Sequence, residues 1–169
     1  MQIINQLKRK EFIEIFGNIF EGSKWIAKQS YKKKPLKDYK ELKKEMINIF
    51  KKSEKKTKIK ILLKHPDLAN KIKIKKLEKF SKNEQIMSEL HKCTKEEYFE
   101  FNELNSKYKK KFGFPFILAV AGKKKVQILK IFRKRILYSK RNEFNQAIKE
   151  VIKIALFRLD HLNKKQIIK

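Results

Sequence analysis

His65 is the residue of this chain best suited to acid–base chemistry. An imidazole ordinarily titrates near neutral pH, so it can both donate and accept a proton. His65 lies in the stretch Lys64-His65-Pro66-Asp67-Leu68, and a proline disfavours helical backbone at the residue before it. We therefore expect a helix to end here, with the ring able to face a cleft. Taken alone, an ordinary histidine at a helix end, stabilised by the helix dipole, is the simpler interpretation.

Ser81, Glu84 and Gln85 form a second polar group. Their spacing of three and four residues puts a hydroxyl, a carboxylate and an amide on one face of a helix. Such a face can bind a polar substrate. Solvated helix surfaces produce the same pattern more often, and Ser81 also suits the N-cap of a helix.

Arg158 and an apolar segment complete the set of candidates. Arg158 lies between Phe157 and Leu159; its planar fork suits bidentate binding of a carboxylate, although a surface arginine covering apolar neighbours fits equally well. The run Phe114–Ala121 is apolar, contains a proline and is followed by a glycine. Its irregular backbone could line a pocket with free amides, but packing in the core is the default expectation.

Metal chemistry is not expected. His91 and Cys93 are two residues apart and so face different sides of a helix. Cys93 is the single cysteine, which excludes an intrachain disulfide and a multi-thiolate metal site and suits a reducing compartment. Cys93 follows Ile86 and Leu90 at helical spacing and is expected in the core. No glycine-rich phosphate loop or metalloprotease motif occurs.

The formal net charge of +28 first suggests nucleic acid as a partner. However, arginine supplies five of the 46 basic residues and lysine the other 41. Scattered lysine is typical of a solvated surface, whereas base recognition favours arginine. The best nucleic-acid candidate is a cluster on one expected helix, interpreted more simply as a solvated face: Lys130, Arg133, Lys134 and Arg135.

Periodicity predicts an all-α fold, a single compact domain over residues 1–169 with seven or eight helices. Four glycines and three prolines leave little material for turn-rich β architectures. Thr94 and Glu97 form a capping box that starts one helix. One irregular extended segment is expected at about 112–122. With the helix that starts at Thr94 included, the expected helices span about 10–20, 23–29, 42–50, 54–65, 81–85, 94–111, 123–137 and 143–162.

A cytoplasmic protein is expected from the distribution of apolar residues. Residues 1–20 include charged side chains and lack the apolar stretch of a signal peptide. The most apolar stretch, 112–122, is about half as long as a membrane-spanning helix. We therefore expect no membrane association.

Taken in order, these motifs resemble the OHCU decarboxylases, enzymes of urate degradation that act on 2-oxo-4-hydroxy-4-carboxy-5-ureidoimidazoline (OHCU). The resemblance covers about residues 10–162. Its most specific blocks are His-Pro-Asp-Leu-Ala at 65–69 and Phe-Gly-Phe-Pro-Phe-Ile at 112–117. The other matching stretches are Phe16–Ala27, Ser81–Gln85, Phe101–Tyr108, Gly122–Lys123, Ile128–Leu129 and Glu143–Leu162.

The resemblance implies an all-α, usually dimeric enzyme that converts OHCU into (S)-allantoin and CO₂ without a metal or an organic cofactor. His65 matches the catalytic histidine, and we assign Glu84 to polarise it. The positions implied to hold the small anionic substrate are Pro66, Ser81, Glu84, Gln85, Phe116, Ile117, Leu118, Ala119, Val120 and Arg158.

Two other interpretations were weighed. One is a small basic helical protein that binds nucleic acid through the Lys130–Arg135 face. The other is a fold that has lost its catalysis, which the intact set of His65, Glu84, Gln85 and Arg158 disfavours. In the decarboxylase interpretation, the positive field has a secondary role in drawing the anionic substrate toward the site.

Overall fold

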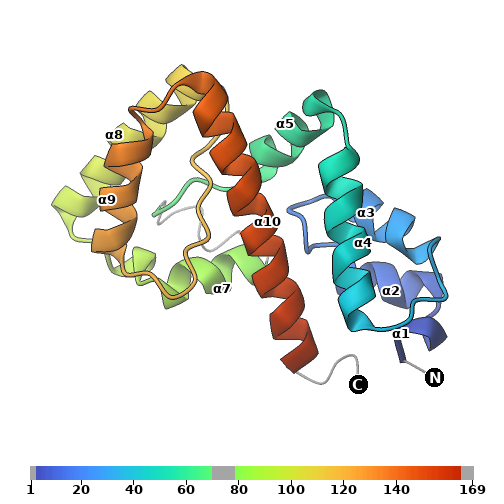
Figure 1. Ribbon diagram of the computed structural model, residues 1–169. Coiled ribbons are helices and arrows are strands. Elements are labelled where there is room, and N and C mark those ends of the chain that lie inside the picture. The colour runs from blue at the N-terminus through green and yellow to red at the C-terminus, as the bar shows by residue number, and fades with distance from the viewer. Residues whose placement is uncertain (1–2, 70–78, 165–169) are drawn as a thin grey trace. The chain divides into compact units, whose positions relative to one another are not determined.

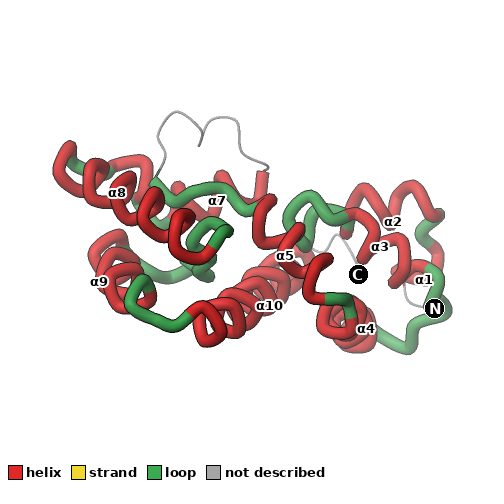
Figure 2. The backbone as a smooth tube through the Cα atoms, turned by 90° about the horizontal axis from the view of Figure 1, so that it is seen from above, coloured by secondary structure: helices red, strands yellow, loops and turns green. Residues whose placement is uncertain are grey.

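The described part of the chain is built from helices. The computed structural model describes residues 3–69 and 79–164, and within these ranges it contains nine α-helices, one 3₁₀-helix and no strand (Figures 1 and 2). The predicted all-α class is confirmed. The chain divides into two compact units, an amino-terminal unit of residues 1–64 and 152–169 and a central unit of residues 65–151. The prediction of one domain over the whole chain stays a prediction.

The amino-terminal unit begins with five helices. Gly22 adopts a left-handed φ of 53°, and the residue after it, Ser23, is the N-cap of the third helix. The predicted helix at 10–20 is wrong at its end, because the helix stops at Phe16 and Gly17 and Asn18 both have poor helix propensity. Asp38 caps the fourth helix by accepting the Glu41 N–H at 2.7 Å. The helices are α1 (Ile3–Gln6), α2 (Arg9–Phe16), α3 (Lys24–Tyr31), α4 (Tyr39–Lys52) and α5 (Lys55–Lys64).

Aromatic and aliphatic side chains fill the core of this unit. Phe20 and Phe50 pack with ring centroids 5.0 Å apart, and Phe12 and Phe16 with centroids 4.6 Å apart. The carboxyl-terminal part of the last helix belongs to the same unit, and the Tyr39 hydroxyl donates to the Leu159 carbonyl at 2.6 Å. The apolar stripe of this last helix was predicted from the spacing of apolar side chains in residues 144–162.

The central unit contains the elements that carry most of the predicted site. Thr94 caps α8 as predicted: its hydroxyl accepts the Glu97 N–H at 3.2 Å, and the Glu97 carboxylate accepts the Thr94 N–H at 2.8 Å. Gly113 ends the same helix with a left-handed φ of 79°. The elements are α7 (Lys79–Met87), the 3₁₀-helix η1 (Leu90–Lys92), α8 (Lys95–Phe112), α9 (Lys125–Arg135) and the first part of α10 (Lys140–Lys164).

A non-helical stretch joins α8 to α9, as the long loop between these helices in Figure 1 shows. The predicted irregular segment at 112–122 is therefore confirmed, except that Phe112 still belongs to α8. Phe114–Val120 is buried throughout. Within this stretch, the Phe116 ring stacks on Phe132 with centroids 3.8 Å apart, and the Tyr108 ring packs edge-on against both rings.

Within residues 3–69 and 79–164, no helix combines the length and the apolar composition needed to cross a membrane.

Candidate active site

His65 follows directly after the last residue of α5, as expected from a helix that ends before Pro66. Its side chain is largely buried. The backbone then turns sharply, and Ala69 takes a left-handed φ of 58°. A non-glycine residue in this region is uncommon and needs surrounding contacts to hold it. Surrounding contacts must therefore hold the conformation of residues 65–69, which form the histidine loop.

Gln85 of α7 holds the far end of the histidine loop. Its side-chain oxygen accepts the Ala69 N–H at 3.1 Å, and its side-chain nitrogen donates to the Asp67 carbonyl at 3.2 Å. One buried amide therefore satisfies two backbone groups of the loop. The residue predicted to bind substrate is a supporting residue of the histidine loop in this structure.

Helix α8 holds the same loop from a second direction. Asn105 donates its side-chain N–H to the Leu68 carbonyl at 3.0 Å, and the Lys109 ammonium pairs with the Asp67 carboxylate at 2.8 Å. Both residues were missed as functional candidates, although an amide on the apolar stripe of this helix was a usable signal. The Asn105 Oδ1 atom is buried and finds no donor among the described residues.

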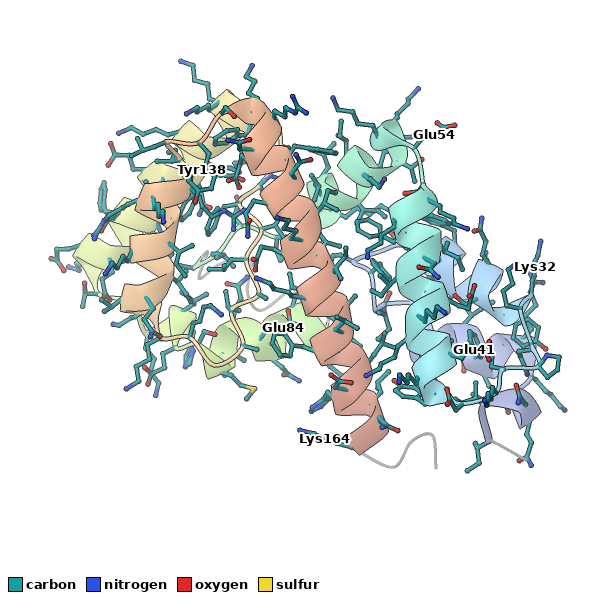
Figure 3. The ribbon with its side chains drawn as sticks, viewed as in Figure 1. Lys32, Glu41, Glu54, Glu84, Tyr138 and Lys164 are labelled. Atoms are coloured by element: carbon teal, nitrogen blue, oxygen red, sulfur yellow. The ribbon has the colours of Figure 1, made fainter. Side chains whose placement is uncertain are left out.

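One face of α7 faces inward. Ser81 and Gln85 are buried on it, and Ser88 is buried in the turn just after the helix. Glu84 is half-buried on α7, where Figure 3 labels it. Ser81 lies inside the helix, so the interpretation as an N-cap is wrong. The structure therefore places the predicted triple on a protected face and not on a solvated one.

The segment of residues 116–120 is held by side chains at three points. The hydroxyl of Ser88, the residue just after α7, donates to the Val120 carbonyl at 2.8 Å. The Glu150 carboxylate of α10 accepts the Ala119 N–H at 2.9 Å, and Arg135 of α9 donates to the Ile117 carbonyl at 2.7 Å. The expectation of free amides throughout this segment is therefore wrong at Ala119.

Phe116 contributes its backbone to the segment but its ring to the core. The ring is buried against Phe132, and the Arg135 guanidinium lies 4.5 Å from its centroid. Arg135 also pairs with the buried Glu143, whose carboxylate accepts the Tyr108 hydroxyl. Burial, and then this bond to Glu143, raise the pKa of Tyr108 far above its usual value.

Arg158 belongs to the amino-terminal unit and is buried there, so the interpretation as a surface arginine is wrong. Its guanidinium pairs with the Glu21 carboxylate at 3.0 Å and donates to the carbonyls of Asn18 and Ile19 at 3.2 and 3.3 Å. The carboxylate that it meets in this structure is thus one of the chain's own.

The basic cluster on α9 is not a continuous solvated face. Arg135 is buried with Glu143, and Arg133 forms two hydrogen bonds to the Glu100 carboxylate at 2.5 and 2.7 Å. Both guanidinium groups are therefore paired with carboxylates of the chain itself, which weakens the proposed nucleic-acid face because arginines are its best phosphate ligands.

Two further features lie outside the site. A hollow of about 890 Å³ in the amino-terminal unit is lined by residues of α3, α4, α5 and their connections, including Trp25, Lys52, Lys60 and Lys64. None of the predicted site residues lines it, and its lysines reflect the composition of the chain. Among residues 3–69 and 79–164, no three acidic, histidine or cysteine side chains are grouped as a metal site requires.

Comparison with known sequences identifies the family to which this arrangement belongs. The sequence profile described as OHCU decarboxylase matches residues 5–160, nearly the whole chain. The chain belongs to the OHCU decarboxylase family. Its membership accounts for the motifs from which the resemblance was inferred, including the histidine loop and the segment 116–120.

Individual relatives of this OHCU decarboxylase family member agree. A uric acid degradation bifunctional protein of Bacillus sp. (strain TB-90) is 36% identical over 94% of the chain, which spans only 31% of that relative. A 2-oxo-4-hydroxy-4-carboxy-5-ureidoimidazoline decarboxylase of Haloferax volcanii is 31% identical over 94% of this chain and 93% of its own length. The crystal structure of an OHCU decarboxylase in the presence of (S)-allantoin superimposes with a TM-score of 0.70 at 26% identity, covering 85% of this chain and 94% of that one.

Within the central unit of this OHCU decarboxylase family member, hydrogen bonds connect three of the predicted pieces. Gln85 joins α7 to the histidine loop, and Ser88 joins α7 to the segment 116–120. Pro66 lies in the loop and is half-buried. Sequence reasoning missed Ser88, Arg135 and Glu150 because their partners lie 18 to 32 residues away in the chain.

Proposed function

We propose that this chain is a carboxy-lyase that converts OHCU into (S)-allantoin and CO₂ in urate degradation. Family membership supports the proposal, as does the similarity to a Haloferax volcanii relative that bears the name of this decarboxylase. The structural observation that carries it is the pair of hydrogen bonds from Gln85, which ties the face of α7 to the loop bearing His65. An acid–base residue and a polar helix face are thereby kept in one buried region.

The chemistry of the substrate makes such a region sufficient. When the C–CO₂ bond breaks, CO₂ leaves and the bonding electron pair stays with the ring, where the adjacent C=N framework accepts it. No external electron sink is then needed, so we propose that the reaction uses no metal or organic cofactor. A proton must be delivered to carbon on one face to give the (S) product.

We assign the proton transfer to His65. A histidine at a protected loop can hold a proton at the pH of the cell and deliver it to one position. Glu84, half-buried on the face of α7, polarises the imidazole in this proposal. If the two groups are oriented in this way, proton transfer is accelerated because the geometry is set before the substrate arrives.

The substrate's polar edges need donors and acceptors. We propose that Pro66 packs against the substrate, that Ser81 and Gln85 present polar atoms to it, and that backbone groups of residues 116–120 hold the ureido and ring groups. The role of Arg158 as ligand of the substrate carboxylate stays a prediction from the family resemblance. Glu21 already neutralises Arg158 in this structure, so carboxylate binding by Arg158 would compete with that pair.

We also propose a homodimer in the cytoplasm. The dimer rests on the family resemblance, and sedimentation equilibrium tests it by giving twice the mass of one chain. The single cysteine, Cys93, is buried and suits a reducing compartment.

The activity is tested with freshly made substrate. OHCU is generated from urate with the two preceding enzymes, this protein is added, and circular dichroism records the formation of optically active allantoin. We expect (S)-allantoin to appear much faster than in the spontaneous reaction, which gives a racemate. If optically active allantoin forms no faster than without the protein, the proposed function is wrong.

A variant of His65 tests its role, and the chain offers a matched control. General acid–base catalysis typically contributes about 10²- to 10⁴-fold, so His65→Asn should lower kcat by at least about 100-fold. His161 is exposed on α10, and His161→Asn should leave kcat unchanged. A folded His65→Asn variant with full activity would remove the catalytic role from this residue.

A further inference from the structure

Side chains from three places in the central unit bind the backbone of residues 116–120. Arg135 of α9 binds the Ile117 carbonyl, and Glu150 of α10 binds the Ala119 N–H. Ser88, in the turn just after α7, binds the Val120 carbonyl. In a planar trans peptide the C=O and the N–H point in opposite directions, so the Leu118 N–H faces away from Arg135.

Two backbone donors of the segment remain. The backbone N–H groups of Leu118 and Val120 donate to no acceptor in the described part of the chain, although both residues are buried. Buried N–H groups are nearly always paired in native proteins, so two unpaired donors so close together indicate a ligand acceptor.

We propose that Ser88, Arg135 and Glu150 are positioning residues that turn the Leu118 and Val120 N–H groups toward the substrate. This inference rests on the proposed function and deepens it. The three side chains occupy the polar groups on either side of these two donors, so the segment cannot rotate without breaking a hydrogen bond. The two donors then meet an oxygen of the anionic substrate and stabilise the charge that develops on it as CO₂ leaves.

The surroundings of the three side chains suit this role. All three are buried, and a buried carboxylate is a stronger acceptor for a backbone N–H than a neutral group. Gln146 donates to the other oxygen of Glu150 at 2.9 Å, which orients the carboxylate. Ser88 is the first residue after α7 and its N–H donates to the Glu84 carbonyl, so one helix and its end set the positions of both the histidine loop and the segment.

Ser88→Ala is the primary test, and Ser30→Ala is its matched control. Ser88 and Ser30 are both buried serines whose hydroxyls donate to a backbone carbonyl, at 2.8 and 2.9 Å. Ser30 lies in the amino-terminal unit, outside the proposed site. Each variant is purified, its melting temperature is measured, and kcat and KM for OHCU are determined by circular dichroism.

We expect Ser88→Ala to lower kcat/KM by about 10-fold or more, because small displacements of positioning groups have effects of this order. Most of the loss should appear in kcat, since the donors act mainly on charge that develops in the transition state. Ser30→Ala should keep the wild-type kcat and KM. Equal kinetics in the two serine variants, with wild-type turnover intact, would overturn the positioning role; a wild type without turnover would refute the proposed function instead.

Glu150 gives an independent test with a conservative partner variant. Glu150→Leu removes the acceptor of the Ala119 N–H, and hydrogen exchange at Ala119 should become faster as kcat falls. Glu150→Gln keeps an acceptor oxygen, and Gln146 can turn its amide to match, so exchange protection and a larger part of kcat should be retained. A Glu150→Leu variant with fast exchange at Ala119 but wild-type kcat would show that the bond is purely structural and would overturn the inference.

Discussion

The buried pair of Arg135 and Glu143 offers the sharpest test of how the central unit is held together. The exposed fractions of the two side chains are 3% and 0%, so water screens their attraction very little. Arg135→Met removes the guanidinium and leaves the Glu143 carboxylate buried, with the Tyr108 hydroxyl as its remaining donor among the described residues. The Ile117 carbonyl also loses its donor.

The magnitude follows from these lost contacts. Breaking a buried ion pair by removing one partner costs about 3–5 kcal/mol. The free energy of unfolding of an ordinary domain is about 5–15 kcal/mol, so the variant should lose about a fifth of it or more. At roughly 2–4 °C per kcal/mol for a chain of this size, the melting temperature should fall by about 6–20 °C.

The assay is thermal and urea denaturation followed by far-ultraviolet circular dichroism. Arg133→Met on the same helix is the control: its side chain is 58% exposed, and its loss should shift the melting temperature little. In the double variant Arg135→Met/Glu143→Gln no lone charge remains, and the glutamine oxygen can still accept the Tyr108 hydroxyl. The double variant should therefore be more stable than Arg135→Met alone. A double variant that is less stable, with the two single losses adding up, would refute the reasoning.

Three further predictions concern pH, capping and salt. The pKa of Tyr108 is raised by burial and by Glu143, so its contribution to stability is full below a pH of about 10 and decreases above it, by up to about 1.4 kcal/mol per pH unit. Between a pH of about 9 and a pH of about 11, the wild type should therefore lose more stability than Tyr108→Phe. Equal losses in the two proteins, measured by urea denaturation, would contradict this. Thr94→Ala should lower the free energy of unfolding by about 1 kcal/mol through loss of the cap, and an unchanged urea midpoint would argue against the cap. If the charge of +28 steers the anionic substrate, kcat/KM should fall as ionic strength rises; a value independent of salt would remove the steering role.

Features set by neighbouring residues could be predicted from the sequence. The end of α5 before Pro66 and the capping box at Thr94 depend on interactions within a few residues, and both were confirmed. The end of α2 was predicted four residues too late, because weak helix formers such as Gly17 and Asn18 give only a gradual signal.

The partners of the buried polar groups could not be predicted. Arg158 was ambiguous from its neighbours, and only the fold shows that it is buried with Glu21, which lies far away in the chain. Arg135 was counted among solvated residues, because nothing in its immediate sequence distinguishes it from Arg133 or from the surrounding lysines.

The sequence by itself determined the helical class, the family and the identity of the candidate residues, since residue types and short-range spacing encode all three. The tertiary structure decided how those residues are held. It made Gln85 a support of the histidine loop, assigned the Ala119 N–H to Glu150, and left the N–H groups of Leu118 and Val120 without acceptors in the described residues. These outcomes depend on hydrogen bonds between groups 16 or more residues apart, which arise only when the helices pack.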